Sequence, residues 1–162
     1  MIKRDVSVHY YELDDISMLP ADEQELMRQA REMTNDAYAP YSAFYVGAAI
    51  LLENGVIVKG SNQENGAYPS GLCAERVAAF AASANHPGVA MTKIAVSARS
   101  NRLEVKDPVS PCGACRQVLL EYESLQNKPL KMIMGKENGK ILVVEKISDL
   151  LPLSFSGMDL KD

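Results

Sequence analysis

Residues 44–59 read FYVGAAILLENGVIVK. Two apolar runs, 44–53 and 56–59, are joined by the turn residues Asn54 and Gly55. An Asn-Gly pair between two such runs is the strongest short-range signal for a β-hairpin. The stretch therefore predicts two antiparallel strands, around which the rest of the chain can be arranged.

Helical patterns lie on both sides of this hairpin. Pro20 stands at a first helical position, acidic residues follow in the first turn, and apolar residues then recur at helical spacing. This pattern predicts a helix that begins at Pro20 and ends before Pro40. A second helix is predicted over residues 73–86. Its composition is almost wholly apolar, so we expect it to be buried on all sides by its own domain or by a partner subunit.

The later elements complete a mixed sheet. In chain order they are a strand at 93–99, a helix at 111–122 with Ser110 as its N-cap, a second Asn-Gly hairpin between 129–134 and 140–145, and a short terminal helix near 147–151. Helices interleaved with five strands predict a three-layer α/β domain, with a mixed five-stranded sheet flanked by helices. We assign residues 20–162 to this single domain and residues 1–19 to an N-terminal arm of uncertain structure. Alternating apolar residues in the arm permit a short strand there.

Composition limits the class of protein. The chain has 162 residues, of which 47% are hydrophobic and 23% are charged, as is typical of one globular domain. With 17 Lys and Arg against 21 Asp and Glu, the net charge is −4, and no basic tract offers a surface to a polynucleotide. No apolar run approaches the roughly 20 residues of a membrane helix, and the start lacks a signal-peptide core. We therefore expect a cytoplasmic protein without nucleic-acid or membrane partners.

Three cysteines carry the chemical signal. Cys73, Cys112 and Cys115 are an odd number of thiols, which argues against a disulfide framework. Both segments place their cysteines at a predicted helix N-terminus, where free N–H groups stabilise a thiolate. Cys112 and Cys115 are three residues apart and share one helix face. The pattern predicts a zinc ion clamped by Cys112 and Cys115, with Cys73 as the third ligand.

The number of ligands distinguishes a catalytic zinc site from a structural one. Structural zinc has four protein ligands, whereas catalytic zinc keeps one position for water. His86 lies about 20 Å from Cys73 along a continuous helix, which is out of reach. His9 lies in the arm, where its position in the sequence does not exclude it. Water is the simplest fourth ligand, and this favours a catalytic site.

The residues that follow Cys73 complete the candidate chemistry. Arg76 lies one helical turn beyond Cys73 on the same face, where it can donate to the thiolate and withdraw negative charge. Glu75 is rotated about 200° from Cys73, which makes it a poor ligand but a candidate acid and base. The plainer alternatives are a surface salt bridge for Arg76 and an ordinary first-turn carboxylate for Glu75. For the cysteines, they are a thioredoxin-like redox pair or a structural zinc.

These residues resemble the signature of the zinc-dependent deaminases, in which a ligand-x-Glu segment is followed by Pro-Cys-x-x-Cys. Here the signature has its all-cysteine form, with Cys73, Ala74 and Glu75 followed by residues 111–115. The chain is similar to the small homotetrameric cytidine deaminases over about residues 26–156, with PYSAF at 40–44, VGAA at 46–49, NQEN at 62–65 and LLPLSF at 150–155.

The resemblance implies a set of substrate contacts. Phe44 is expected to stack on the pyrimidine, and Asn62 and Glu64 are expected to hydrogen-bond the ribose hydroxyl. Ala74 is expected to line the substrate site. The alternative for Phe44 is a strand core residue, and for Asn62 and Glu64 it is a loop that caps itself through side-chain hydrogen bonds.

The resemblance also implies a homotetramer. Tyr68 and Phe155 match positions that reach into a neighbouring subunit's pocket in this family, although each could instead be core or interface packing. Two positions depart from the family's pattern. Tyr45 stands where a proline or small residue is common, which affects the expected shape of the pocket wall, and Gly66 stands where alanine is common.

The implied reaction is hydrolytic deamination of cytidine and 2′-deoxycytidine to uridine and 2′-deoxyuridine, a step of pyrimidine salvage, with one zinc ion per chain. Zinc is expected to activate water, and Glu75 is expected to pass a proton to N3 and then to the leaving amino group. One alternative is a deaminase of the same fold for another cytosine nucleoside, such as blasticidin S. An alternative from a different class is a non-catalytic zinc or redox binding module.

Overall fold

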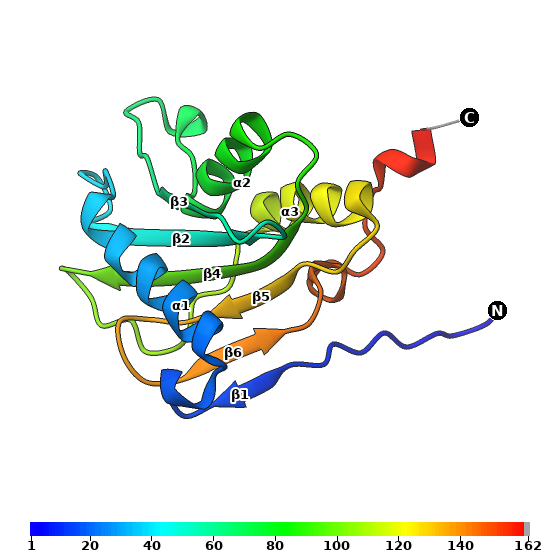
Figure 1. Ribbon diagram of the computed structural model, residues 1–162, viewed down its shortest axis with the longest axis horizontal. Coiled ribbons are helices and arrows are strands. Elements are labelled where there is room, and N and C mark those ends of the chain that lie inside the picture. Colours follow the sequence, from blue (N-terminus) through cyan, green and yellow to red (C-terminus); the bar gives the residue numbers. More distant parts are fainter. Residues whose placement is uncertain (161–162) are drawn as a thin grey trace.

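Helices cover both faces of a six-stranded sheet in the computed structural model, which describes residues 1–160 (Figure 1). The strands are β1 (Tyr11–Leu13), β2 (Phe44–Leu52), β3 (Ile57–Ser61), β4 (Met91–Ser100), β5 (Lys131–Met134) and β6 (Ile141–Val144). The α-helices are α1 (Ala21–Met33), α2 (Ala74–Asn85) and α3 (Gly113–Gln126). Short 3₁₀ helices η1 to η5 lie at Ile16–Met18, Thr34–Asp36, Tyr68–Ser70, Ile147–Leu150 and Gly157–Leu160. The predicted three-layer α/β class is confirmed.

The sheet is mixed, as predicted, and its strands follow the order β1-β6-β5-β4-β2-β3. β2 is antiparallel to β3, and Gly55 in the turn between them has φ +85°, a conformation that glycine adopts without strain. β5 and β6 form the second predicted hairpin. β4 and β5 are parallel, with Ile94 opposite Met132, and α3 supplies the crossover that a parallel pair requires.

The prediction of five strands was wrong by one. Within the arm, Tyr11–Leu13 form β1, which pairs with β6 and places Glu12 opposite Leu142. The apolar residues Val6 and Val8 lie outside this strand and are exposed. A strand of three residues carries almost no periodicity, and its partner comes from the other end of the chain. Only the folded sheet brings these two segments together.

The two faces of the sheet bury different helices. Neighbouring residues of a strand point to opposite faces, and in β2 Ala49 packs with Leu26 of α1, whereas Ala48 belongs to the core beneath α2 and α3. Ala78 of α2 and Leu119 of α3 are both fully buried in that second core. Of the three α-helices, α2 and α3 therefore share one face and α1 covers the other (Figure 1).

Two glycines let helices approach the central hairpin. A Cβ atom on Gly60 of β3 would lie 2.6 Å from the backbone nitrogen of Ala78 and 2.7 Å from the carbonyl oxygen of Ala74. On the opposite face, a Cβ atom on Gly47 of β2 would lie 2.1 Å from the carbonyl oxygen of Ala30 in α1. Both contacts involve backbone atoms, which cannot move aside as a side chain can. The hairpin is therefore clasped between α1 and α2.

Two helices differ from what the sequence predicts, α3 in the residue at which it begins and α2 in how far it is buried. α3 begins at Gly113 with Cys112 as its N-cap, two residues later than predicted, because Cys112 has φ −66° and ψ 166° and the chain is still extended there. α2 is not buried on all sides in the single chain: Ala78 faces the core, but Phe80 is 42% exposed. A helix in an outer layer contacts its own domain along one face only. No helix in the described part of the chain has the length and apolar character needed to cross a membrane.

The close approach at Gly60 predicts a large effect of one methyl group. In Gly60→Ala, the new Cβ must push α2 away from β3, and overpacking of this kind costs about 1–3 kcal/mol of unfolding free energy. The measurement is the urea midpoint at constant m-value. The matched control is Gly113→Ala, whose Cβ meets no atom within 4 Å, and we expect it to leave stability unchanged or slightly raised. Equal midpoints for the two variants would contradict the packing argument.

Candidate metal and substrate site

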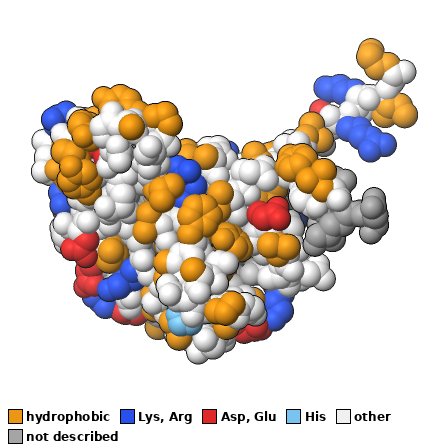
Figure 2. All heavy atoms as spheres, turned by 90° about the horizontal axis from the view of Figure 1, so that it is seen from above, with side chains coloured by type: hydrophobic (Ala, Val, Ile, Leu, Met, Phe, Trp, Pro, Cys, Tyr) orange, Lys and Arg blue, Asp and Glu red, His pale blue; other side chains and the backbone are white. Residues whose placement is uncertain are grey.

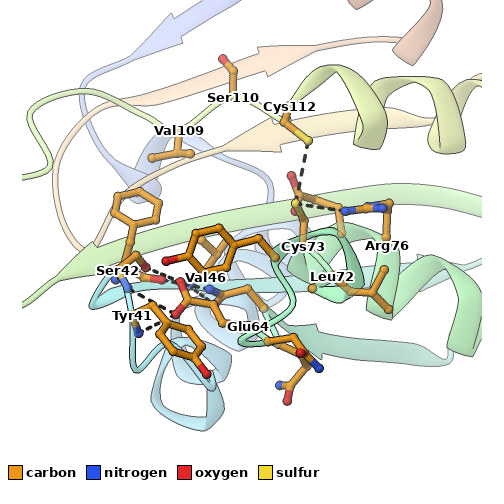
Figure 3. A pocket seen from close by; sticks show the side chains of 17 residues that line it. Tyr41, Ser42, Val46, Glu64, Leu72, Cys73, Arg76, Val109, Ser110 and Cys112 are labelled. Carbon is orange, nitrogen blue, oxygen red and sulfur yellow. Dashed lines mark hydrogen bonds between the residues drawn. The ribbon is translucent and has the colours of Figure 1, made fainter.

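The three cysteines meet at the starts of two helices. Cys73 is the N-cap of α2, Cys112 is the N-cap of α3, and Cys115 lies in the first turn of α3. The Sγ atom of Cys112 is 3.8 Å from that of Cys73 and 3.5 Å from that of Cys115. All three sulfur atoms lie within 4.8 Å of one another. The structure thus brings together the three predicted ligands, Cys73 from one segment and Cys112 and Cys115 from another, and Figure 3 shows the contact between Cys73 and Cys112.

Local backbone geometry leaves these thiols available. Cys73 and Cys112 both have extended dihedral angles, and neither side chain bonds to the N–H groups of its own helix. Those N–H groups, together with the helix dipole, favour negative charge at this point. The sulfur atoms are therefore free to bind a cation while their thiolate form is stabilised.

Ionisation differs among the three thiols. Interactions with the Cys115 thiol and with Arg76 lower the pKa of Cys73 to about 5. The pKa of Cys115 is raised, first by its interaction with Cys73 and then by burial. The Cys73 thiolate is thus stabilised beside a Cys115 thiol that keeps its proton.

The donor set fits zinc. With Zn–S bonds of about 2.3 Å, tetrahedral ligands lie roughly 3.8 Å apart, and the observed separations of 3.8 and 3.5 Å match this value. No histidine or carboxylate joins the cluster among the described residues. His86 is the C-cap of α2, at the opposite end from Cys73, and the ring of His9 lies near Ser7 in the exposed arm. Three protein ligands leave room for a further ligand, as in catalytic zinc sites.

Arg76 lies beside the cluster, as predicted. Its Nη2 atom donates to the Sγ atom of Cys73 over 3.7 Å. In the described part of the chain, its Nε atom is buried without a hydrogen-bond partner and the guanidinium forms no salt bridge. The interaction with Cys73 raises the pKa of Arg76, so the guanidinium stays protonated and positively charged. The predicted contact with the thiolate is present, and a surface salt bridge is not.

Glu75 is not an ordinary first-turn carboxylate, because its side chain is buried. Only 4% of the residue is exposed, yet it lines the pocket next to the cysteines. Burial, followed by the negative charge of Cys73, raises the pKa of the Glu75 carboxyl. A raised pKa brings a carboxyl group closer to the range that suits a catalytic acid and base.

A pocket of about 770 Å³ opens beside the cysteines. This volume is within the range of small-molecule sites, about 300–1,000 Å³. Its lining brings together eight of the predicted site residues: Phe44, Asn62, Glu64, Tyr68, Cys73, Glu75, Arg76 and Cys112. Tyr41, Ser42, Val109 and Ser110 also line it, from the segments before β2 and before α3 (Figure 3). The sequence therefore predicted eight of the residues that line the pocket, and the structure adds the others.

Asn62 and Glu64 are held by their surroundings. The side-chain oxygen of Asn62 accepts from the Val46 amide at 2.8 Å, and its Nδ2 atom donates to the Phe44 carbonyl at 2.9 Å. Glu64 accepts from the Tyr41 amide at 2.9 Å and from the Ser42 hydroxyl. These hydrogen bonds outweigh burial and lower the pKa of Glu64, so it is an anion at neutral pH.

Phe44 follows a strained backbone position. Ala43 has φ +52°, in the left-handed region that residues other than glycine rarely adopt. Two donors hold its carbonyl oxygen there, the Ser100 hydroxyl at 2.9 Å and the Asn101 amide at 3.3 Å. The bend at Ala43 turns the chain into β2, and Phe44 then lines the pocket. The sequence gives no signal for this bend.

The remaining predicted residues have different surroundings. Ala74 is fully buried as the first residue of α2. Tyr68 lines the pocket but is 76% exposed, with its ring 6.0 Å from that of Tyr41. Phe155 is 61% exposed and does not line the pocket of its own chain. Its carbonyl accepts from Gln117 of α3 at 3.1 Å.

Two arginines that the sequence analysis did not select position the pocket loops. Arg116 donates from Nε to the Pro111 carbonyl at 2.8 Å and from Nη1 to the Leu150 carbonyl at 3.0 Å, which fixes the segment before Cys112. Arg102 donates to the Tyr41 carbonyl at 2.8 Å. These contacts have no signal in sequence spacing, because their acceptors are backbone carbonyls, and those of Leu150 and Tyr41 belong to remote segments.

Comparisons with known proteins agree with this geometry. Residues 20–127 match the cytidine and deoxycytidylate deaminase zinc-binding region. The chain is 38% identical over 143 residues to a cytidine deaminase of Halalkalibacterium halodurans, covering 87% of this chain and 99% of that protein. It is 41% identical over 140 residues to one of Sporosarcina psychrophila, covering 86% and 95%. A crystal structure of cytidine deaminase from Burkholderia pseudomallei superposes with a TM-score of 0.71 at 38% identity, covering 81% of this chain and 97% of that one.

The sulfur cluster predicts the metal content of the protein. We expect about one zinc per chain by elemental analysis, and we expect the thiols to be protected from alkylation until a chelator is added. Cys115→Ala should lose the metal. His9→Gln and His86→Gln are the controls and should retain it, because neither ring lies in the cluster. Loss of zinc from either histidine variant, or a reversible disulfide in place of bound metal, would contradict the three-thiol site.

Proposed function

The chain belongs to the cytidine and deoxycytidylate deaminase family, and on that premise we propose that it hydrolyses cytidine and 2′-deoxycytidine to uridine and 2′-deoxyuridine with release of ammonia. One observation carries the proposal. A buried carboxyl group, Glu75, lies beside three clustered thiols in a pocket large enough for a nucleoside. Hydrolysis at C4 of the pyrimidine needs an activated water and a proton carrier, and these two features provide for both.

Cys73, Cys112 and Cys115 are the residues that hold the zinc ion. When bound there, the metal supplies the Lewis acidity that activates water near neutral pH. Arg76 donates to the Cys73 sulfur and so withdraws part of the negative charge that three thiolates accumulate. This arrangement keeps the ligand set from weakening the metal's electrophilic character.

Glu75 carries the protons. It accepts a proton from the attacking water and delivers it to N3 of the pyrimidine as the water oxygen bonds to C4. Glu75 then moves the proton that remains on the new C4 hydroxyl to the departing amino group. This second transfer releases ammonia and leaves the uracil ring. Protonation of N3 stabilises the transition state more than the ground state, because charge develops on N3 only as the ring loses its conjugation. Burial suits Glu75 to this role, since its raised pKa brings both protonation states within reach.

Substrate binding is assigned to three further residues that line the same pocket. Phe44 stacks on the pyrimidine, while Asn62 and Glu64 bind the ribose hydroxyl. Asn62 donates one side-chain N–H to the Phe44 carbonyl, and its second side-chain N–H can donate to a ligand. Glu64 is held as an anion by hydrogen bonds from the Tyr41 amide and the Ser42 hydroxyl. Hydrogen bonds to the protein thus orient these two side chains before substrate arrives, which reduces the entropy cost of binding. The expected substrate contact of Ala74 has no counterpart in the pocket lining, because this residue is fully buried at the start of α2.

A homotetramer completes the pocket in this proposal, with Tyr68 and Phe155 contributed across subunit contacts. Both rings are largely exposed in the single chain, at 76% and 61%, and so is part of Phe80 on α2. Figure 2 views the molecule from above, relative to Figure 1, and shows hydrophobic side chains gathered in patches on the face that it presents.

We assign the protein to the cytoplasm, where reducing conditions keep three thiols available for zinc.

Replacement of Glu75 tests the proton carrier. Glu75→Gln should lower kcat by at least about 10²–10⁴-fold, the usual contribution of a positioned acid and base, while zinc content stays unchanged. The measurement is the loss of cytidine absorbance under saturating substrate. Glu104→Gln is the matched control, because Glu104 is exposed in the loop after β4, and its kcat should equal that of the unmodified protein. A Glu75→Gln variant that keeps a tenth of the rate would contradict the assignment.

A substrate panel tests the specificity. We expect zinc-dependent turnover of cytidine and 2′-deoxycytidine, and no turnover of adenosine or free cytosine. Blasticidin S is the diagnostic competitor. If it were the only compound deaminated, the fold and chemistry would stand and the substrate assignment would be wrong. If zinc-loaded protein deaminated none of the panel, the binding-module alternative would replace the enzyme proposal.

A further inference from the structure

A second pocket, of about 270 Å³, lies on the face of the sheet that α1 covers. It is formed by the C-terminal half of α1, the end of β4 and the loop after β5. Nine residues line it: Arg28, Arg31, Glu32, Thr34, Asn35, Ser97, Ala98, Arg99 and Glu137. None of them lines the pocket beside the cysteines, which lies on the other side of the same strands. The catalytic proposal therefore leaves this pocket without a function.

Ser97 is the least explained side chain of this pocket. The residue is fully buried, on the same face of β4 as Ala95, which packs with α1. Its hydroxyl has no hydrogen-bond partner within residues 1–160. Buried polar groups are almost always paired, and a lone one needs an explanation. Because Ser97 lines the pocket, a molecule bound there can be the partner of its hydroxyl.

Two arginines of this pocket have no acidic partner. Arg31 is half-buried and donates from Nε to the Lys136 carbonyl at 3.1 Å, while its two terminal nitrogens have no partner in the described part of the chain. Arg99 lies 4.5 Å from the ring centre of Tyr45 and donates to the Thr34 hydroxyl at 3.1 Å. All of these acceptors are neutral, so neither guanidinium forms an ion pair within the described residues.

The other charged residues of the pocket are Arg28, Glu32 and Glu137. Arg28 and Glu32 form a salt bridge with each other, and Arg28 also pairs with Glu25. Burial lowers the pKa of Arg31, against the opposing effect of the Glu137 charge, and Glu137 forms no ion pair with Arg31 among the described residues. The lining holds three arginines and two glutamates, and Glu25 adds one negative charge from outside the lining, next to Arg28. The groups that favour an anion are therefore Arg31 and Arg99, which form no ion pair among the described residues.

We propose that this pocket binds a tetrahedral oxyanion of the phosphate type. Guanidinium groups bind phosphate through paired N–H donors, and the terminal nitrogens of Arg31 are available for this purpose. Ser97 belongs to β4 and Arg31 to α1, so the pocket has candidate donors on two different elements. The volume is below the range of drug-sized sites, about 300–1,000 Å³, and this limits the occupant to a small ion or to the phosphate end of an ester.

Calorimetric titration of the zinc-loaded protein tests the proposal. Inorganic phosphate is the first probe, at fixed ionic strength balanced with sodium chloride so that general screening is constant. We expect one saturable site per chain. Ribose 5-phosphate is the second probe: comparable binding would identify phosphate esters as ligands, and its exclusion would identify the free ion. Acetate is the planar control, and binding equal to that of phosphate would overturn the ligand class.

Matched variants locate the site. Arg31→Gln should weaken phosphate binding by about tenfold or more, as expected for loss of a charged hydrogen bond, and Ser97→Ala should weaken it by a smaller factor. Lys59→Gln on β3 is the control, because it removes one positive charge from an exposed side chain that lines neither pocket, and it should bind as the unmodified protein does. Ser97→Ala removes only an unpaired hydroxyl, so the test stands even if Arg31→Gln does not fold. Absence of saturable binding by the unmodified protein would overturn the proposal. So would Arg31→Gln and Ser97→Ala variants that bind phosphate as tightly as the unmodified protein does.

Discussion

The site depends on two helix N-termini that are held side by side on one face of the sheet. α2 reaches this position because Gly60 lets its backbone lie against β3, and α3 reaches it through the crossover between β4 and β5. Each helix begins with a cysteine at its N-cap, so the meeting of the two helices is also the meeting of the thiols. Packing of apolar layers thus fixes the position of a polar cluster.

Two glutamates illustrate how environment divides chemical roles. Glu75 is buried near negative sulfur, which raises its pKa and suits it to move protons. Glu64 is held by the Tyr41 amide and the Ser42 hydroxyl, which lower its pKa and suit it to accept hydrogen bonds from a ligand. The same side chain serves two purposes in one pocket because burial favours the neutral form of a carboxyl and hydrogen-bond donors favour the charged form.

The strands at the centre of the sheet serve two cavities. In β2, Phe44 and Val46 line the pocket beside the cysteines, while Tyr45, between them, pairs with Arg99 of β4 and contacts its guanidinium. Tyr45 is the position at which the sequence departs from the family pattern. It supports the arginine of the second pocket rather than the wall of the first. A strand whose neighbours alternate between faces can carry two sites without conflict.

The sequence by itself determined the elements with strong local signals. These include both Asn-Gly hairpins, the first helix, which the sequence predicts from Pro20 and which begins at Ala21 with Pro20 as its N-cap, the mixed α/β class, and the three cysteines with Glu75 and Arg76 beside them. Local signals sufficed because turn conformation, helical spacing and thiol chemistry act between residues close in the chain. Only the tertiary structure decided the sixth strand, the late start of α3 at Gly113, the bend at Ala43 and the second pocket. Each of these depends on backbone edges, carbonyl acceptors or charges supplied by remote segments, and such partners have no signature in the sequence around the residue that needs them.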